Sequence, residues 1–321
     1  MVTVLIKVAA AIFSTLFAFI LLSQVTRLWI ESCIPRDGKI IPIGGINLHY
    51  VDRGTGRPIV FIHGLSGQLR NFAPALVDSL AADHRVILID RPGSGYSAPL
   101  PRGKNTLANQ ANSLAGLIAA LNLDAPLVVG HSLGGAVALN LALNHPDKVG
   151  ALALIAPATQ PRDRAASAFS AMAIPSDALR RFVSLTFAAP LGLLIFDRSA
   201  KAVFAPEPMP TQFATKGGSL LSIRPRSFFA AGGDMIALRD ALPAMAARYP
   251  SLQLPTGVLY GRSDQVLEPD IHGARLRDAV PGATMTQIEG GHMIVYTQPD
   301  VVADWILAQV LQTANMGQPN D

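Results

Sequence analysis

The sequence has little charge and a single cysteine, and both shortages exclude classes of protein. Charged residues make up 15% of the 321 residues, and no run of five or six basic residues occurs, although the formal net charge is +4. This pattern gives no support for a nucleic-acid partner. Cys33 alone cannot form an intrachain disulfide. The seven His residues show no spacing known from metal sites, and we expect neither a metal nor a cofactor.

The N-terminal segment is instead a long apolar run. The 18 residues from Val8 to Val25 carry no charge, and as a helix they would measure roughly 27 Å, close to the hydrocarbon thickness of a bilayer. We expect residues 1–30 to form a retained, single-pass membrane anchor. A cleaved secretory signal is the less favoured alternative, because Phe17 to Val25 lacks the small-x-small pair of a cleavage site. A buried core helix is least favoured.

The charges around this run do not decide which side of the membrane holds the rest of the chain. Lys and Arg are more numerous after the run than before it, which favours a cytoplasmic C-terminal side. A short N-terminal tail more often stays inside, which favours the opposite orientation. The side therefore stays open, as does the oligomeric state.

After a short linker, short buried strands alternate with amphipathic helices. This alternation predicts an α/β protein with a mostly parallel, doubly wound sheet covered on both faces. The expected strands are Ile46–Val51, Pro58–Ile62, Arg85–Asp90, Leu127–Gly130, Ala151–Ala156, Thr256–Tyr260 and Thr284–Glu289. The expected helices are Leu69–Ala82, Thr106–Leu121, Leu133–Leu143, Ser176–Ala189, Leu267–Val280 and Val301–Leu311.

The alternation stops for about 90 residues in the second half of the chain, where helical stretches dominate. We interpret residues 157–250 as a helical cap over the C-terminal edge of the sheet, the edge at which such sheets carry their sites. The core is then formed by residues 40–156 and 251–314. Met316 to Asp321 is expected to be a frayed tail.

The segment Gly130-His131-Ser132-Leu133-Gly134 matches the pattern G-x-S-x-G. The pattern alone is weak, but here a strand precedes it and a helix follows it. A serine on such a turn has a strained backbone and a hydroxyl exposed above the sheet edge. Glycines flank it because a Cβ would clash in so sharp a turn. Ser132 is therefore predicted to be a catalytic nucleophile, and a serine that only caps the helix is the alternative.

A serine nucleophile needs a base and a carboxylate that orients the base. His292 follows the last strand in the sequence EGGHM, in a loop that two glycines allow to fold over the serine. Asp264 follows the strand before it, in the turn GRSDQV. The chain order Ser, Asp, His is the one that this arrangement uses. Glu268 and Asp270 are the alternatives to Asp264.

The loop after the strand Pro58–Ile62 is expected to approach the nucleophile. Its sequence is HGLSG, from His63 onwards. We expect the backbone N–H groups of Leu65 and Leu133 to form the oxyanion hole. His63 is expected to order the loop and not to accept the proton, because the turn directs its ring away.

From about Gly44 to Leu311 the sequence resembles the α/β-hydrolase superfamily, in its cap-bearing branch. The matching motifs are HGLSG, DRPGSGYS, GHSLGG, GRSDQV and GGHM, in this order. The resemblance implies that Asp90 and Arg91 support the sheet edge and the loop. Ser132 argues against the dehalogenases and epoxide hydrolases of the superfamily, which use an aspartate. HGLSG is not the HGGG type of many lipases, whereas the apolar N-terminus is similar to membrane-anchored monoacylglycerol lipases.

The resemblance implies a serine hydrolase that cleaves carboxylic esters, without a cofactor, through an acyl-enzyme. The apolar segments FVSLTFAAPLGLLIF and RSFFAAGGDMIAL of the expected cap favour a lipophilic or acyl-glycerol-like substrate. One alternative is a cofactor-free haloperoxidase that uses the same triad. The other is a catalytically silent, membrane-tethered binding protein.

Overall fold

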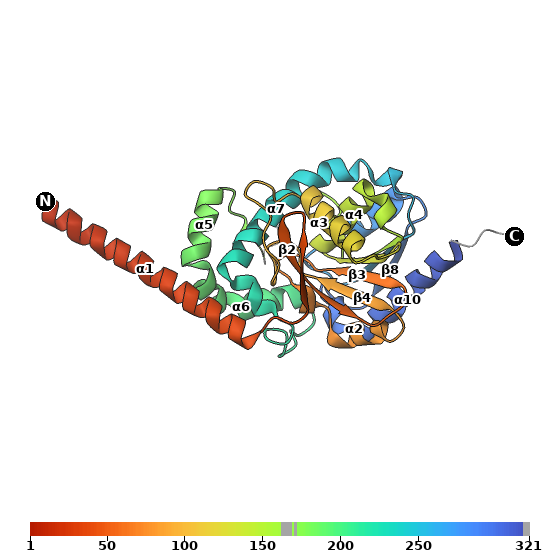
Figure 1. Ribbon diagram of the computed structural model, residues 1–321, viewed down its shortest axis with the longest axis horizontal. Helices are drawn as coiled ribbons and strands as arrows, with labels where there is room; N and C mark the ends of the chain where they lie inside the picture. The colour runs from red at the N-terminus through yellow and green to blue at the C-terminus, as the bar shows by residue number, and fades with distance from the viewer. Residues whose placement is uncertain (162–168, 170–171, 317–321) are drawn as a thin grey trace.

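The computed structural model describes residues 1–161, 169 and 172–316. Its centre is an eight-stranded sheet with the strand order β1-β2-β4-β3-β5-β6-β7-β8 (Figure 1). The strands are β1 (Lys39–Ile43), β2 (Ile46–Arg53), β3 (Pro58–Ile62), β4 (Arg85–Ile89), β5 (Leu127–His131), β6 (Ala151–Ile155), β7 (Thr256–Gly261) and β8 (Thr284–Ile288). The expected frayed tail lies, from residue 317 onwards, outside the described residues.

The pairing confirms the predicted mostly parallel sheet. β1 pairs with β2 and β2 with β4 in antiparallel register, whereas every pair from β4 to β8 is parallel. β5 and β6 are buried along their whole length, as expected for strands with helices on both faces. The carboxyl ends of β5, β7 and β8 therefore meet at one edge of the sheet, where the candidate site lies.

Helices cover both faces of this sheet. Helices α3 and α4 lie on one face and α2 and α10 on the other (Figure 1). The core helices are α2 (Pro74–Ala81), α3 (Leu107–Ala120), α4 (Leu133–Asn144), α8 (Arg275–Ala279), α9 (Ile294–Thr297) and α10 (Pro299–Met316), with short 3-10 turns η1 (Leu69–Asn71) and η2 (Pro146–Lys148) and a π-helix, η6 (Pro269–Ala274).

We call the described residues between β6 and β7 the helical insertion. Its elements are α5 (Asp177–Thr186), α6 (Ala188–Phe204), α7 (Pro225–Ala246) and the 3-10 turns η4 (Ser219–Ile223) and η5 (Tyr249–Ser251). The N-terminal helix α1 (Val2–Cys33) packs its C-terminal half against α5 and α6, and its N-terminal half extends beyond them, away from the sheet (Figure 1). Helix α1 is long and apolar enough to cross a membrane.

Four local expectations were wrong. The helix expected over Ser176–Ala189 ends at Thr186, and Ala188 begins α6 after a bend of 80°. Strand β1 lies in the segment interpreted as a linker; it is an edge strand that contains Pro42 and is mostly exposed, so it lacks the alternation of a half-buried strand. The helix expected over Leu69–Ala82 is divided into η1 and α2, because Phe72 and Ala73 are extended and Pro74 begins the second part. The helix expected over Leu267–Val280 contains a π-helical first part, η6.

Candidate active site

Ser132 lies on the strained turn between β5 and α4. Its backbone has φ 55° and ψ −122°, a conformation that is costly for a residue with a Cβ and is typical of functional sites. Three backbone bonds hold the turn. The Ser132 N–H donates to the carbonyl of Ile155 at 3.0 Å, and the Ser132 carbonyl accepts from the N–H groups of Gly135 at 2.9 Å and Ala158 at 3.0 Å. The Ser132 side chain does not cap α4, which removes the support for a purely capping role.

The glycines around Ser132 are required by close approaches of backbone. A Cβ on Gly134 would lie 2.1 Å from the carbonyl oxygen of Ile62. A Cβ on Gly130 would lie 2.7 Å from the Gly134 carbonyl oxygen. Both distances are far inside van der Waals contact, so any larger residue would force the turn open. The pattern G-x-S-x-G thus reflects the packing of α4 against the end of β3.

The structure brings His292 and Asp264 together. Nδ1 of His292 lies 2.8 Å from Oδ2 of Asp264, and both side chains are buried. The other carboxylate oxygen of Asp264 accepts from the backbone N–H groups of Val266 and Leu267, at 2.8 and 2.9 Å. Burial would raise the pKa of Asp264, but the charge and hydrogen bond of His292, together with these two N–H groups, hold its pKa below the usual value. The carboxylate is therefore ionised and fixed against Nδ1, as an orienting group requires.

The alternatives to Asp264 lie in a different environment. Glu268 and Asp270 are exposed at the start of η6, whereas Asp264 is 7% exposed and bonded to His292. The geometry therefore favours Asp264 as the partner of the histidine.

Sequence reasoning missed the residue that holds the His292 loop. Glu207, from the helical insertion, accepts from the Gly291 N–H at 2.8 Å through Oε2 and from the Thr297 hydroxyl at 2.8 Å through Oε1. Its two oxygens thus connect the residue before His292 to helix α9. The available signal was an acidic residue between two prolines, in the segment APEPMP.

The HGLSG loop passes directly over Ser132. A Cβ on Gly64 would lie 2.9 Å from the Ser132 Cβ. The loop is held by Arg91, whose guanidinium donates to the carbonyl oxygens of His63 at 3.0 Å and Gly64 at 2.9 Å. The Gly64 carbonyl belongs to the same planar peptide group as the Leu65 N–H, and in a trans peptide the two point in opposite directions. Arg91 therefore orients the N–H group that was predicted to bind the oxyanion.

Two further histidines near the site are structural. His63 accepts from the Arg91 N–H through Nε2 at 3.0 Å, and the second ring nitrogen lies 2.9 Å from the Gly64 carbonyl oxygen. Burial, and then the charge of Arg91, lower the pKa of His63 to about 3. Nε2 of His131 lies 3.0 Å from the backbone carbonyl of His292, and burial lowers the pKa of His131 to about 3. Both rings stay neutral at ordinary pH and order the loops around Ser132.

Arg91 also connects the core to the helical insertion. Its Nη1 donates to Asp234 of α7 at 2.7 Å and to Gln110 of α3 at 2.8 Å, and the side chains of Arg91 and Asp234 are fully buried. The second oxygen of Asp234 accepts from Gln110 and Asn105, both at 2.9 Å. A buried ion pair needs such additional bonds to offset its desolvation. Asp234 was not predicted, although it is the one acidic residue in the apolar segment RSFFAAGGDMIAL.

Asp90 supports the same edge of the sheet, as the family resemblance implied. Its carboxylate accepts from the N–H groups of Leu69 and Tyr96, at 2.8 and 2.7 Å. The side chain also pairs with His49 at 2.7 Å. Burial would raise the pKa of Asp90, but the hydrogen bond and charge of His49 outweigh it and lower the pKa. Asp90 thus fastens the loops after β3 and β4 to β2.

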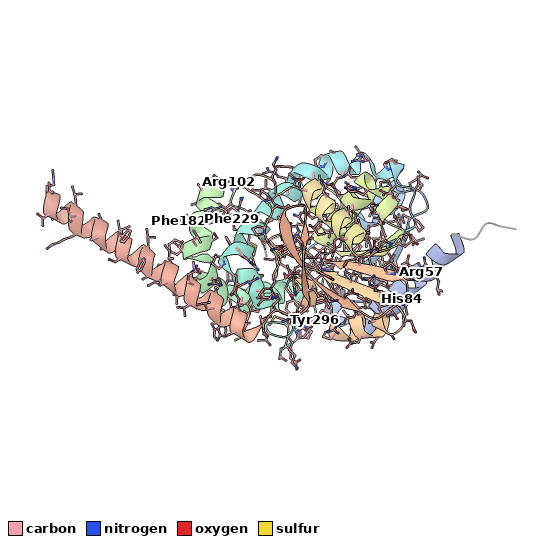
Figure 2. The ribbon with its side chains drawn as sticks, viewed as in Figure 1. Arg57, His84, Arg102, Phe182, Phe229 and Tyr296 are labelled. Carbon is pink, nitrogen blue, oxygen red and sulfur yellow. The ribbon has the colours of Figure 1, made fainter. Side chains whose placement is uncertain are left out.

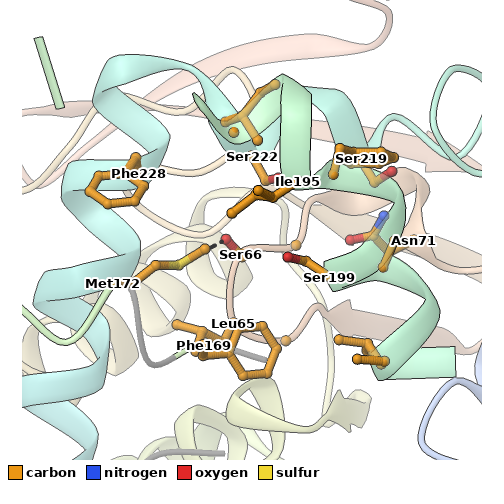
Figure 3. A pocket seen from close by; sticks show the side chains of 18 of the residues that line it. Leu65, Ser66, Asn71, Phe169, Met172, Ile195, Ser199, Ser219, Ser222 and Phe228 are labelled. Carbon is orange, nitrogen blue, oxygen red and sulfur yellow. Dashed lines mark hydrogen bonds between the residues drawn. The ribbon is translucent and has the colours of Figure 1, made fainter. Parts of the chain in front are cut away.

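A cavity of about 650 Å³ lies over Ser132 and His292. This volume is within the range of small-molecule sites. Figure 3 shows Leu65 and Phe169 on one side of the space and Ile195 and Phe228 on the other. The Ser66 hydroxyl lies 3.5 Å from Sδ of Met172 between them. The walls come from the HGLSG loop and from the helical insertion, so the insertion shapes the space above the serine. Within the described residues, no group of three or more His, Cys, Asp or Glu could hold a metal.

Comparison with known proteins identifies the family. The profile of the alpha/beta hydrolase fold matches residues 57–299. The pimeloyl-[acyl-carrier protein] methyl ester esterase of Chromobacterium violaceum is 31% identical over 75% of this chain and 88% of its own length. A dihydrolipoyllysine-residue acetyltransferase component of the acetoin cleaving system of Cupriavidus necator is 40% identical, but the chain spans only 30% of its length. A crystal structure of a membrane phospholipase A, described as a bacterial virulence factor, matches 98% of this chain and 97% of its own with a TM-score of 0.65 and 21% identity.

The chain belongs to the α/β-hydrolase family and is a serine hydrolase, as the sequence predicted. The likeness to the phospholipase structure shows the fold alone, at that level of identity. The finer resemblance to membrane-anchored monoacylglycerol lipases stays a prediction, as do the roles of Ser132, Asp264, His292, Leu65 and Leu133.

Proposed function

We propose that this protein hydrolyses carboxylic esters of lipophilic acids, with Ser132 as nucleophile, His292 as general base and Asp264 as the group that orients it. The observation that carries the proposal is the buried pair of Asp264 and His292, in which the histidine lines the same cavity as Ser132 on its strained turn. The esterase of Chromobacterium violaceum acts on a methyl ester by its name, which supports the same class of bond here.

In the proposed reaction, Nε2 of His292 accepts the proton of the Ser132 hydroxyl as Oγ attacks the ester carbonyl. The tetrahedral oxyanion is bound by the backbone N–H groups of Leu65 and Leu133, and each such donor contributes roughly 3–4 kcal/mol. His292 then protonates the leaving alcohol. Departure of the alcohol leaves the acyl group on Oγ. His292 then accepts a proton from water, which attacks the acyl carbonyl; the acyl–Oγ bond breaks, the acid is released and the proton returns from His292 to Oγ of Ser132. Asp264 stays ionised throughout and stabilises the imidazolium.

The lining of the cavity supports an acyl chain as the part of the substrate that is recognised. Beyond the serine, the walls include Val183, Phe187, Leu191, Phe204 and Met293. Apolar walls with few polar groups bind the hydrocarbon part of a ligand and leave the polar groups to orient it. Lipid-like and acyl-glycerol-like esters have this combination.

The structure also supports retention of α1 as a membrane anchor. Ile30, near its C-terminal end, and Ile34, directly after it, are buried in an apolar cluster with Leu221 of the helical insertion. Glu31 pairs with the buried Arg224 at 2.9 Å. Removal of α1 as a signal peptide would expose this cluster and leave Arg224 without that carboxylate. We therefore favour the anchor over a cleaved signal.

The test is labelling by a fluorophosphonate probe, combined with a panel of p-nitrophenyl esters and monoacylglycerols. The full chain is expected to be labelled in the membrane fraction, to cleave the longer acyl esters, and to lose both properties in Ser132→Ala. Turnover that survives Ser132→Ala would rule out the mechanism. Halogenation that depends on acetate and peroxide, without ester turnover, would favour a haloperoxidase instead. A folded chain that is not labelled by the probe and that neither cleaves the esters nor halogenates would favour a catalytically silent binding protein.

A further inference from the structure

Helix α1 contacts the rest of the protein along one stripe. Ser23, Thr26 and Ile30 are buried on this stripe. It continues towards the N-terminus to Phe19, whose ring meets the ring of Phe187 edge-on, with the centroids 4.9 Å apart. Phe187 is the residue between α5 and α6. The corner of these two helices therefore contacts α1 inside its uncharged run.

The position of the Phe19–Phe187 contact along α1 indicates how deep Phe187 would lie in a bilayer. Phe19 is six residues before Val25, the last residue of the uncharged run, which corresponds to roughly 9 Å along a helix. If α1 crosses a bilayer, Phe187 then lies at about the depth to which interfacial amphipathic helices bury their apolar faces, roughly 5–10 Å. The inference rests on the proposed role of α1 as a retained anchor.

The outer faces of α5 and α6 are apolar, as a surface at this depth in a bilayer would be. Their exposed large apolar residues are Leu179, Phe182 and Leu185 on α5, and Leu191, Leu194 and Ile195 on α6. Among the described residues outside α1, the other exposed large apolar side chains are Ile40, Val301 and Leu311, which are scattered. Figure 2 places Phe182 on the side of the molecule from which α1 extends. A gathered apolar patch of this kind marks an interaction surface.

The two helices cannot cross the membrane as one straight span, because they are bent by 80° at their junction. They fit instead at its surface. Arg181, Arg198 and Lys201 are exposed on the same helices, where cationic groups can reach lipid phosphates.

The cavity above Ser132 opens at this patch. Leu191 and Ile195 line the cavity, and they are also 49% and 48% exposed. Phe187, whose ring contacts Phe19 of α1, lines the cavity at the corner, and Val183 lines it from α5. The mouth of the site is thus formed by the side chains that face the proposed bilayer.

We propose that α5 and α6 insert their exposed apolar faces into the bilayer that α1 crosses, so that the ester passes from the membrane directly into the cavity. The occupant of this surface is lipid. Helix α1 supplies the depth, and the two insertion helices supply the entry route to Ser132.

The experiment uses the full chain in vesicles of phosphatidylcholine and phosphatidylglycerol. Single cysteines replace Ile12, Leu194 or Leu311 in a Cys33→Ser background and carry the fluorophore NBD. Ile12 reports on the anchor, Leu194 on the insertion, and Leu311 is an exposed leucine of α10 that serves as control. Quenching by spin-labelled lipid and by aqueous iodide is measured for each, after fluorophosphonate labelling has shown that each variant is folded.

We expect lipid to quench the probes at 12 and 194 several-fold more than the probe at 311, and iodide to show the reverse order. Lipid quenching at 12 but not at 194 would overturn this inference and leave the anchor intact. Absence of lipid quenching at 12 would refute the anchor itself. Protection of 194 from iodide without quenching by lipid would show that a second copy of the chain covers the patch, which also contradicts the inference.

A functional measurement complements the depth measurement. Leu194 is 80% exposed and does not line the cavity, so Leu194→Glu should leave turnover of a water-soluble short ester unchanged. Turnover of a monoacylglycerol embedded in vesicles is expected to fall several-fold. Ile40→Glu, at an exposed position on β1, is the matched control. Equal effects of the two variants on the embedded substrate would contradict entry through the patch.

Discussion

Replacement of Arg91 by lysine separates two contributions of this residue. The guanidinium uses Nε and Nη2 to orient the peptide groups of His63 and Gly64, and Nη1 to pair with Asp234. Lysine keeps a positive charge beside Asp234, but its ammonium cannot reproduce a planar fork of donors. Arg91→Lys therefore keeps most of the ion pair and releases the peptide group that carries the Leu65 N–H.

The size of the effect follows from the geometry. Complete removal of one oxyanion donor typically lowers kcat by about 10²- to 10³-fold. In Arg91→Lys the Leu65 N–H is still present but no longer held, so we expect a loss of about 10- to 100-fold in kcat, with 10³-fold as the limit. KM should change little, because Arg91 does not line the cavity. Arg91→Met would in addition leave Asp234 buried without its cation, which typically costs about 3–5 kcal/mol of stability.

The assay is steady-state hydrolysis of a p-nitrophenyl ester by the full chain in detergent micelles, with the thermal midpoint measured in parallel. Arg239→Lys is the matched control, since Arg239 is an exposed arginine that pairs only with its neighbour Asp240 among the described residues. A lower kcat in Arg91→Lys, with a thermal midpoint that falls but stays above the assay temperature, supports the reasoning, since buried acceptors that lose their donor cost some stability. An unchanged kcat, or a change confined to KM, would show that Arg91 does not position the oxyanion hole.

Three further results are expected. Asp264→Asn should lower kcat by up to roughly 10⁴-fold, the loss found for the equivalent change in a serine-protease triad, with the binding of a substrate analogue retained; turnover near wild type would exclude Asp264 as the orienting group. The pKa values of His63 and His131 are about 3 in the folded chain and near 6.5 in the unfolded chain, so acid protonates the unfolded chain first. Below roughly pH 6.5, each of these two histidines therefore lowers the free energy of unfolding by about 1.4 kcal/mol per pH unit. The thermal midpoint of His63→Gln should fall less steeply than that of wild type between pH 7 and pH 5, and parallel slopes would contradict this. Gly134→Ala places a Cβ 2.1 Å from a backbone oxygen, so differential scanning calorimetry should show a clear loss of stability, which an unchanged midpoint would disprove.

The sheet was predictable because its strands are short, β-branched and bounded by glycine or proline. Pro58–Ile62 has the predicted boundaries, and Arg85–Ile89 differs by one residue. Strand β1 was not predictable, because it is an edge strand whose burial is nearly all on one residue, Ile43. The alternation of apolar and polar residues indicates a strand with one buried face, and a strand that is mostly exposed does not show this alternation.

The candidate triad was predictable because each of its members follows a strand, and because the residues around Ser132 and His292 are ones that the local backbone geometry requires. Ser132 needs glycines on both sides, and His292 needs a loop that two glycines allow. The residues that hold the triad in place were not predictable. Asp234 meets Arg91 across 143 positions, and Glu207 meets Gly291 across 84. Such partners are decided by how the helical insertion packs on the core, and no local pattern records that packing.

The proposed acyl-enzyme can be tested directly by mass spectrometry. The full chain is mixed with a p-nitrophenyl ester of a medium-chain acid and quenched in acid within one turnover, and the peptides are then mapped. The mechanism predicts one acyl group on Ser132 in wild type, and none in Ser132→Ala or His292→Ala. Turnover without any acylated peptide, or an acyl group on a different residue, would contradict the assignment of Ser132 as the nucleophile.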